Sequence, residues 1–201
     1  MMEWTAFEDQ ARAEGYTCIC GIDEAGRGPL AGPVYAAAVV LRPGQVIEGV
    51  NDSKKLSEKK REALFDTICS QCVAYGIGSA TEKEIDEINI LNATYLAMQR
   101  AVAALPVQPD CALVDGNRAP DLPLEVRTII KGDAQSASIA AASILAKVSR
   151  DRYMLQMAEK YPQYAFEKHK GYGTKLHYER LEQYGISPIH RLSFLKKWMN
   201  R

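Results

Sequence analysis

The sequence predicts an α/β fold in which a mixed β-sheet is flanked by helices and followed by a small C-terminal helical lobe. Short apolar runs alternate along the chain with longer segments whose apolar residues recur at helical spacing. The first two runs, 16–22 and 34–41, are separated only by a glycine-rich loop, which is too short for a crossover between parallel strands. We therefore expect these two strands to be antiparallel neighbours within a mixed sheet.

Apolar runs that are followed by glycine, proline or polar residues predict the strands. These runs are 16–22, 34–41, 72–80, 111–114 and 126–130. The first run leads into Asp23 and the fourth into Asp115, and the last is followed by Lys-Gly and then Asp133. Three of the expected strands therefore each bring an aspartate to a turn that contains glycine.

The remaining segments predict helices, most of them with a recognisable start or end. Ser57 is a suitable N-cap, and Thr81 with Glu84 has the spacing of a capping box. The segment 136–160 is rich in alanine and serine, so it can lie very close to the sheet or to another helix. After an amphipathic lead-in over 1–15, the expected helices are 57–69, 82–87, 91–105, 136–160, 175–184 and a last one with Ser187-Pro188 as its cap and first position.

Length and composition indicate a globular chain with a sizeable core. Of the 201 residues 47% are hydrophobic, and the sequence shows no linker, repeat or low-complexity segment. No apolar run approaches the ~20 residues of a membrane span, and the acidic N-terminus is unlike a signal peptide. We therefore expect a cytoplasmic protein without a membrane partner, with a main domain over 1–160 and a helical extension over 161–201.

The charges cancel overall but are unevenly distributed. Twenty-five basic and twenty-five acidic residues give no net charge, which by itself indicates no partner. Residues 168–201, however, carry eight lysines and arginines against two glutamates, together with all three histidines, His169, His177 and His190. This tail is a candidate surface for a polyanion, and a solvated helix face is the alternative.

The five cysteines include two closely spaced pairs, which raises the question of a zinc site. The residues are Cys18, Cys20, Cys69, Cys72 and Cys111. The pairs lack the glycine-rich knuckle and the histidine partners that such sites favour. Small buried thiols in a reducing compartment are the better interpretation, and the odd count argues against a disulfide framework.

The stretch 21–34, G-I-D-E-A-G-R-G-P-L-A-G-P-V, holds the strongest functional signal. Asp23 and Glu24 follow a buried strand, where carboxylates are costly unless a cation meets them, and a hard divalent ion suits such ligands. Neighbouring strand residues point to opposite faces, so both acids reach one site only where the strand bends or ends. The adjoining Gly26-Arg27-Gly28 offers an uncovered backbone and a guanidinium suited to phosphate. These features indicate phosphoryl-transfer chemistry, and a solvated surface turn is the alternative.

The three aspartates that follow strands suggest where a metal site would form. If the strands that carry Asp23, Asp115 and Asp133 are neighbours, these carboxylates and Glu24 gather into one cluster. Four carboxylates at short range repel one another, so the cluster requires bound cations. Two Mg²⁺ or Mn²⁺ ions would then hold a phosphodiester, activate water for in-line attack and stabilise the departing oxygen.

The motifs of this chain resemble those of ribonuclease HII, the type 2 ribonuclease H of bacteria. Between Cys18 and Leu195 they read G-I-D-E-A-G-R-G-P-L-A-G-P-V, N-D-S-K-K-L-S, N-I-L-N-A-T, V-D-G-N, K-G-D, A-A-S-I-L-A-K-V-S-R-D, H-K-G-Y-G-T and H-R-L-S-F. The resemblance implies a ribonuclease H-like catalytic domain over 1–160, with 161–201 completing the substrate groove. It also implies an endonuclease that hydrolyses the RNA strand of RNA–DNA hybrids and cuts at single ribonucleotides in duplex DNA, leaving 5′-phosphate and 3′-hydroxyl ends.

The resemblance further implies which acids act. The catalytic, metal-binding acids of the family match Asp23, Glu24, Asp115 and Asp133 one by one. Two alternatives stay open beside this interpretation. Another two-metal nuclease or strand transferase on the same sheet would share the acids without needing the G-R-G element. A nucleic-acid-binding module without catalysis would have no use for a carboxylate cluster near phosphates.

Several residues outside the acid cluster are candidates for substrate binding, and we expect the enzyme to act as a monomer. By resemblance, Gly26-Arg27-Gly28 senses the 2′-hydroxyl, and Tyr172 packs on the sugar beside the ribonucleotide. The alternative for Tyr172 is that it anchors its own loop. Lys54 and Lys55 are either phosphate contacts or solvated lysines. His169 is a candidate for proton transfer, product release or a backbone contact.

Overall fold

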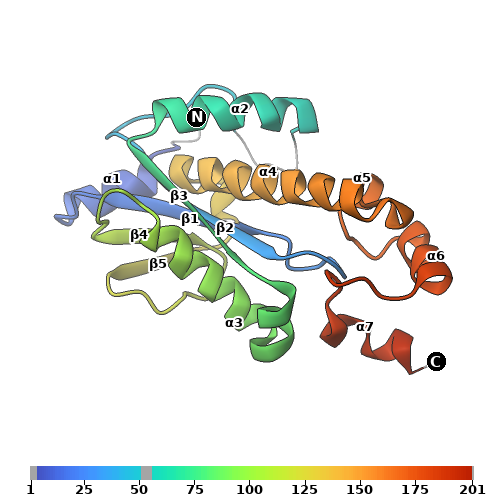
Figure 1. Ribbon diagram of the computed structural model, residues 1–201. Helices are drawn as coiled ribbons and strands as arrows, with labels where there is room; N and C mark the ends of the chain where they lie inside the picture. Colours follow the sequence, from blue (N-terminus) through green and yellow to red (C-terminus); the bar gives the residue numbers. More distant parts are fainter. Residues whose placement is uncertain (1–3, 51–55, 201) are drawn as a thin grey trace.

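The computed structural model describes residues 4–50 and 56–200, and at its centre lies a five-stranded sheet (Figure 1). The strands are β1 (Ile19–Ala25), β2 (Val34–Val40), β3 (Ala74–Ala80), β4 (Cys111–Asp115) and β5 (Glu125–Ile129). Their order across the sheet is β3-β2-β1-β4-β5. The pairs β1–β2 and β2–β3 are antiparallel, whereas β1–β4 and β4–β5 are parallel. The predicted mixed sheet and its early antiparallel pair are therefore confirmed.

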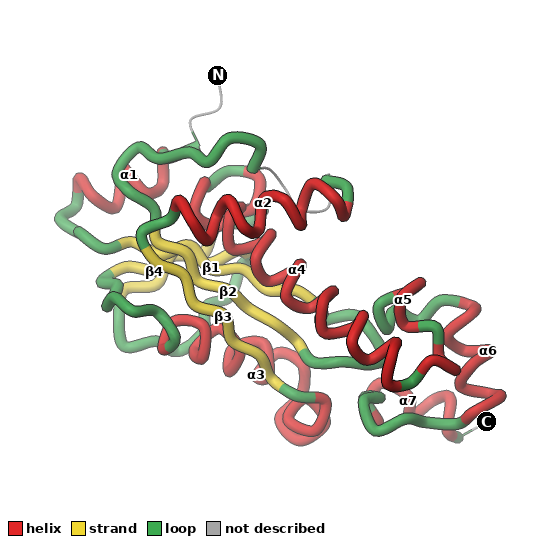
Figure 2. The backbone as a smooth tube through the Cα atoms, turned by 45° about the horizontal axis from the view of Figure 1, so that its top comes forward, coloured by secondary structure: helices red, strands yellow, loops and turns green. Residues whose placement is uncertain are grey.

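Helices cover both faces of the sheet and extend beyond one end of it (Figure 2). They are α1 (Ala6–Ala13), α2 (Glu58–Gln71), α3 (Glu82–Ala103), α4 (Ala137–Lys160), α5 (Phe166–His169), α6 (Lys175–Tyr184) and α7 (Leu192–Met199). The helix α4 crosses one face with α2 outside it, α3 lies on the other face, and α5 to α7 gather around the far end of α4 (Figure 1). No helix within the described ranges is both long and apolar enough to cross a lipid bilayer.

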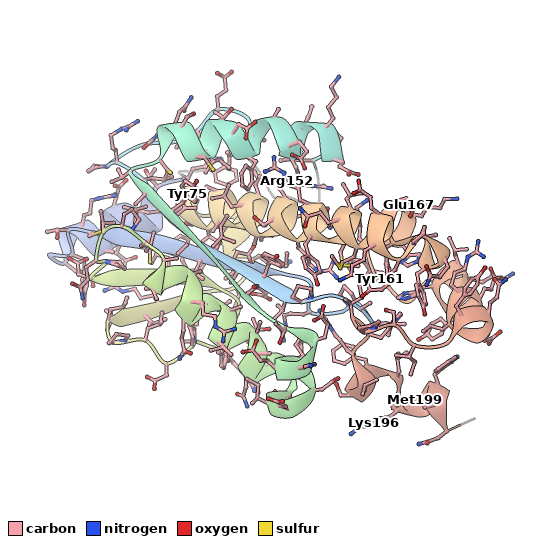
Figure 3. All side chains as sticks on the ribbon, viewed as in Figure 1. Tyr75, Arg152, Tyr161, Glu167, Lys196 and Met199 are labelled. Atoms are coloured by element: carbon pink, nitrogen blue, oxygen red, sulfur yellow. The ribbon has the colours of Figure 1, made fainter. Side chains whose placement is uncertain are left out.

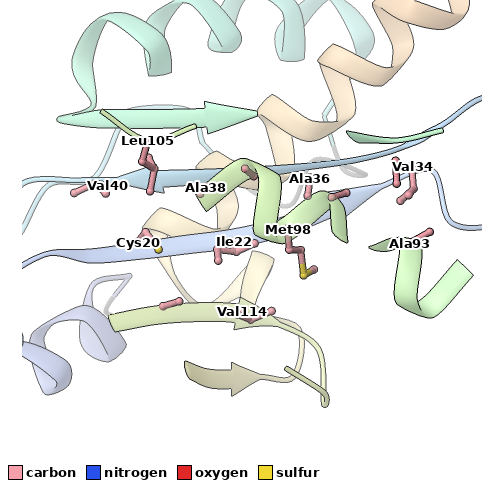
Figure 4. Close-up of a cluster of buried hydrophobic side chains, with 14 of the residues drawn as sticks. Cys20, Ile22, Val34, Ala36, Ala38, Val40, Ala93, Met98, Leu105 and Val114 are labelled. Carbon is pink, nitrogen blue, oxygen red and sulfur yellow. The ribbon is translucent and has the colours of Figure 1, made fainter. Parts of the chain in front are cut away.

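Strand alternation sends successive residues of β1 into two different cores. Cys20 and Ile22 pack with Met98 and other residues of α3 in the cluster that Figure 4 shows. Ile19 packs with Ile139 of α4 on the opposite face. Even-numbered residues of β1 therefore face α3 and odd-numbered ones face α4. This alternation decides where the acids at the end of the strand point.

Gly21 allows α4 to lie directly on β1. A Cβ at this position would be 2.3 Å from the Ile139 nitrogen and 2.3 Å from the Ser138 carbonyl carbon. The predicted close approach of the small-residue helix is thus confirmed. Because both obstacles are backbone atoms, we expect Gly21→Ala to lower the free energy of unfolding by about 3 kcal/mol or more in urea denaturation.

Gly28→Ala is the matched control for that substitution. A Cβ at Gly28 meets nothing closer than 3.9 Å, which is an ordinary contact. The free energy of unfolding of this variant should lie within about 1 kcal/mol of that of the native chain, because surface substitutions usually have small effects. Equal stability of the two variants would contradict the close packing of α4 on β1.

The two helices predicted over 82–87 and 91–105 are confirmed, because α3 consists of two helical segments that meet at a kink at Asn89 (φ 67°), whose Oδ1 accepts from the Leu91 and Asn92 N–H groups. The prediction for the last helix needs correction. The last helix begins at Leu192 and not at Ser187-Pro188. Ser187 binds His190 and closes a turn, while Asp86 of α3 accepts from the Leu192 and Ser193 N–H groups at the start of α7. An acid from another helix, rather than a local N-cap side chain, thus satisfies the first N–H groups of α7.

The cysteines are free thiols, in agreement with the favoured interpretation. Cys20 and Cys111 are fully buried in the sheet, and the other three are half-buried. Burial raises the pKa of the Cys69 and Cys72 thiols above the ordinary value, which disfavours the thiolate that zinc requires. Across residues 4–50 and 56–200, no cysteine takes part in a group of ligands arranged to hold a metal ion.

Candidate active site

Asp23 and Asp115 lie side by side at the ends of two parallel strands. Ile22 of β1 pairs with Val114 of β4, and each acid is the next residue along its strand. Both are odd-numbered positions on the face covered by α4, because Ile19 and Leu113 on the same strands pack against that helix. The parallel register therefore directs these two carboxylates to the same edge and the same face of the sheet.

A cavity of about 250 Å³ opens at this edge. Its lining joins acids from two strands, the G-R-G loop and side chains of α4 and of the loop before α6. The lining residues are Asp23, Glu24, Ala25, Gly26, Arg27, Gly28, Asp115, Ser143, Lys147 and Tyr172. The structure thus brings together three of the four predicted acids, the predicted G-R-G loop and the predicted tyrosine.

Glu24 connects this cavity to the other face of the sheet. As an even-numbered residue it points toward α3, where a second cavity of about 330 Å³ is lined by Glu24, Arg27, Asp115 and residues of α3 and the β4 end. The two cavities share those three residues. Because β1 ends at Ala25, one residue later, both carboxylates reach the same strand end as the sequence predicts.

Asp133 directly follows Gly132, whose backbone contacts Asp115. After β5, Lys131 adopts a left-handed conformation (φ 57°) and the chain enters a 3₁₀ turn over Gly132–Ala134. The Gly132 N–H donates to Asp115 Oδ1 at 2.7 Å. The Asp133 side chain is buried and is not among the residues that line the two cavities.

Burial and mutual repulsion dominate the electrostatics of the acids. Burial raises the pKa of Asp23 well above its ordinary range, and the carboxylates of Glu24 and Asp115 raise it further. The Glu24 N–H, 2.7 Å from Asp23 Oδ1, acts in the opposite direction. Oxygen ligands in a desolvated, mutually repelling set suit a hard divalent cation. In the part of the chain that the structure describes, no group of three or more His, Cys, Asp or Glu side chains is arranged to hold such an ion.

The cationic side chains of Lys147 and Arg27 lie near the acids. Lys147, which lines the cavity, donates to Asp151 at 2.7 Å and forms an ion pair with it within α4. Arg27 contacts Glu24 at 3.2 Å, and its side chain is half exposed. Because the Arg27 guanidinium is half in water, its attraction to Glu24 is weak.

Arg191 fastens the G-R-G loop to the C-terminal lobe. Its Nη2 donates to the Gly26 carbonyl at 2.6 Å and its Nη1 to the Arg27 carbonyl at 2.9 Å. A third bond runs from its Nε to the Gly32 carbonyl at 2.8 Å. Arg191 is fully buried, so its assignment to a basic surface for polyanions is wrong. Burial, with Arg150 as a smaller cause, lowers its pKa to about 9, which leaves it charged at neutral pH.

Arg150 of α4 supports the segment that follows the G-R-G loop. It donates to the carbonyls of Ala31, Pro33 and Lys170 at 3.0, 3.2 and 2.9 Å. Gly26 (φ +96°) is required here, because a Cβ would lie 2.1 Å from Arg150 Nε. Sequence reasoning missed the roles of Arg150 and Arg191. Neither arginine carried a signal in the sequence, because Arg150 stands beside Asp151 and Arg152 in a polar part of its helix and Arg191 lies in a basic tail.

Tyr172 presents its ring to the cavity from the lobe. The side chain is 43% exposed, and its Cε1 atom is 3.9 Å from the Cβ position at Gly28. The Arg150 guanidinium carbon and the Lys147 amine lie 5.8 and 6.0 Å from the ring centroid. The ring is thus placed beside the G-R-G loop and is partly exposed.

The remaining predicted site residues are placed differently. His169 is buried, with its Nδ1 accepting from the Gly171 N–H at 3.2 Å and its Nε2 within 3.0 Å of the Tyr164 carbonyl. His177 and His190 are buried as well, so the expected contribution of histidines to a polyanion surface is wrong. Lys54 and Lys55 lie outside the described residues. Lys196 remains exposed on α7, where Figure 3 shows it at the outer surface of the lobe.

Comparison with known proteins identifies the family. A family model described as "Ribonuclease HII" matches residues 20–197. The chain belongs to the ribonuclease HII family. The ribonuclease HII of Caldicellulosiruptor bescii is 60% identical over 94% of this chain and 92% of its own. That of Marinomonas sp. (strain MWYL1) is 62% identical over 88% of this chain and 89% of its own.

Solved structures agree with the family match. The ribonuclease H2 from Pyrococcus horikoshii OT3 superposes with a TM-score of 0.73 at 31% identity, covering 88% of this chain and 93% of that one. The sheet with its flanking helices is therefore the ribonuclease H-like fold that the sequence predicts. This ribonuclease HII family member is a ribonuclease H, an endonuclease that hydrolyses phosphodiester bonds. The alternative of a binding module without catalysis is set aside.

Proposed function

We propose that this member of the ribonuclease HII family hydrolyses the RNA strand of RNA–DNA hybrids and also incises at single ribonucleotides embedded in duplex DNA. The products are 5′-phosphate and 3′-hydroxyl ends. The observation that supports this proposal is the cavity whose lining joins the buried Asp23 and the half-buried Glu24 and Asp115 to the G-R-G backbone and to the Tyr172 ring. Such a cavity offers a place for a scissile phosphate directly beside groups that can read the adjoining sugar.

The acids Asp23, Glu24, Asp115 and Asp133 are the residues that would hold two divalent ions, Mg²⁺ or Mn²⁺. The repulsion that raises the pKa of Asp23 supports this assignment, because a cation would relieve it. Asp133 is included because it directly follows Gly132, whose N–H binds Asp115. The chemistry such ions supply when bound is activation of water for in-line attack and stabilisation of the departing 3′-oxygen. The protein provides the fixed carboxylates and excludes bulk water around Asp23.

We assign recognition of the ribonucleotide to the backbone of Gly26-Arg27-Gly28. Arg191 fixes the orientation of this loop without help from substrate, since it donates to the Gly26 and Arg27 carbonyls within the protein. The N–H groups of the loop are then the donors for the 2′-hydroxyl oxygen, and that hydroxyl distinguishes RNA from DNA. The loop is rigid before substrate arrives, so that little ordering entropy is lost on binding.

Tyr172 and the lobe that carries it complete the proposed substrate groove. A half-exposed ring beside Gly28 can stack on a deoxyribose, but an added hydroxyl would collide with it, so the ring favours the junction between RNA and DNA. Residues 161–201 therefore serve as an extension of the catalytic domain 1–160. Lys54, Lys55 and the exposed lysines of α7 would bind phosphates and make affinity depend on salt. We assign no substrate contact to His169, because both of its ring nitrogens face backbone groups.

The proposal is tested by cleavage of three substrates with the same sequence. A duplex with one ribonucleotide, a long RNA–DNA hybrid and an all-DNA duplex are incubated with Mg²⁺, Mn²⁺ or a chelator. We expect metal-dependent cutting of the first two, with a 5′-phosphate at the new end, and no cutting of the third. Cutting of all-DNA duplex at a comparable rate would indicate a less selective two-metal nuclease. Cleavage that persists in chelator would refute the metal assignment.

A further inference from the structure

A chain of hydrogen bonds through two buried histidines ends on the backbone of Tyr172. It begins at Ser187, whose N–H donates to His190 Nδ1 at 2.9 Å. Because an N–H cannot accept, that nitrogen of His190 carries no proton, and the ring proton is on Nε2. His190 Nε2 lies 2.9 Å from His177 Nε2. One of these two nitrogens must donate, and only His190 has its proton there.

The tautomer of His177 follows from this arrangement. Its Nε2 accepts from His190, so its own proton is on Nδ1. That Nδ1–H donates to the Tyr172 carbonyl at 2.9 Å. The same carbonyl also accepts from the Thr174 N–H at 2.8 Å, at the start of α6. Neutral histidine in water prefers the proton on Nε2, so the protein selects the less common form.

The surroundings keep both rings neutral. His177 stacks on His169 with ring centroids 4.3 Å apart and meets the edge of Phe166 at 5.6 Å. The titratable groups that act on this cluster are the three histidines themselves, together with Glu167 and Lys170 beside His169. A proton added to His177 or His190 would place two N–H donors against each other. Burial accordingly lowers the pKa of each of these two histidines to about 4.

We propose that His177 is a positioning residue for Tyr172: its Nδ1–H, fixed by His190, holds the Tyr172 backbone so that the ring stands at the mouth of the acidic cavity. This inference rests on the proposed function for the role of Tyr172, whereas the tautomer itself does not. The hydrogen bond from His177 acts only on the loop that carries Tyr172, and it reaches none of the four acids. His177 should therefore set junction preference and leave the cleavage chemistry intact.

The tautomers are tested first, without any substrate. In ¹⁵N-detected NMR of the histidine-labelled protein at pH 7, we expect His177 to carry its proton on Nδ1, and His169 and His190 to carry theirs on Nε2. The native chain with the three assigned rings serves as its own control. A proton on Nε2 of His177 would overturn the inference even if the enzyme cuts every substrate as proposed.

The positioning role is tested with His177→Asn and His177→Leu. An asparagine amide keeps a donor close to the Nδ1 position, whereas leucine has none, and both lose the acceptor for His190. With Tyr172→Ala as the benchmark, we expect His177→Leu to lower kcat/KM about tenfold on the single-ribonucleotide duplex and less than threefold on the long hybrid, as loss of one ordered hydrogen bond implies. On the single-ribonucleotide duplex, His177→Asn should retain most of the kcat/KM that His177→Leu loses.

The outcomes distinguish failure of the proposed function from failure of the positioning role of His177. If the native chain fails to cut at a single ribonucleotide while the NMR tautomers are as expected, the proposed function is wrong and the hydrogen-bond chain stands. If His177→Leu loses activity equally on both substrates, or if His177→Asn performs no better than His177→Leu, the positioning role is refuted. Should His177→Leu not fold, comparison of His177→Asn with the native chain on the two substrates still decides, because a loss on both would exclude a selective role.

Discussion

Asp23→Asn should lower the cleavage rate by at least about a thousandfold and leave the fold as stable as the native chain or more so. The substitution keeps the shape of the side chain but removes the charge at the centre of the acid cluster. Loss of a few kcal/mol of transition-state stabilisation from a metal site corresponds to that factor. The fold gains because burial and the carboxylates of Glu24 and Asp115 oppose a charge at this position.

The measurement combines single-turnover cleavage with thermal unfolding, each with and without Mn²⁺. Mn²⁺ should raise the melting temperature of the native chain by mass action and that of Asp23→Asn much less. Asp110→Asn is the control, because Asp110 binds the Thr17 and Cys18 N–H groups at the opposite end of the strands. It should keep its activity while losing some stability. A fully active Asp23→Asn enzyme would contradict the assignment of the acids.

The chain should lose stability steeply below pH 6.5. His177 and His190 have a pKa of about 4 in the folded chain, lowered from an ordinary value of 6.5. As the pH falls below 6.5, the unfolded chain binds protons at these two positions and the folded chain does not, so the free energy of unfolding decreases. Each histidine contributes about 1.4 kcal/mol per pH unit, or about 3 kcal/mol by pH 4. Above pH 6.5 neither group changes the stability.

Urea unfolding at pH 7.5, 6.0 and 5.0 tests this expectation. Two carboxylates modify the curve in opposite directions. Glu84, whose pKa is lowered to about 2 chiefly by Arg100, adds to the loss at the acidic end, whereas the raised pKa of Asp23 partly offsets it. The double variant His177→Asn with His190→Asn removes the histidine contribution, so its stability should vary less between pH 6.5 and 5. An unchanged pH slope in this variant would show that other groups cause the loss.

Much of the catalytic edge could be predicted because it depends on short stretches of sequence. Alternation along β1 sends Asp23 and Glu24 to opposite faces, and the early end of the strand lets both reach one edge. The antiparallel start of the sheet followed from the short loop between β1 and β2. Asp115 is the last residue of β4, so its place could be predicted from the apolar run before it.

The parts that could not be predicted depend on contacts between distant residues. Arg191 looks like one more charge in a basic tail, and only the fold places it beside the Gly26 carbonyl, 165 residues earlier in the chain. The histidines likewise look like surface residues until α5 and α6 enclose them. The start of α7 depends on Asp86 from another helix, so the Ser187-Pro188 signal for a local cap was misleading.

The bonds from Arg191 to the G-R-G loop have a consequence for how the enzyme matures during translation. All four acids are synthesised before Arg191, whose guanidinium anchors the G-R-G loop. A nascent chain therefore carries the carboxylates before the G-R-G loop is anchored. A chain cut short before Arg191 would keep the four acids but would lack the two bonds that hold this loop in place.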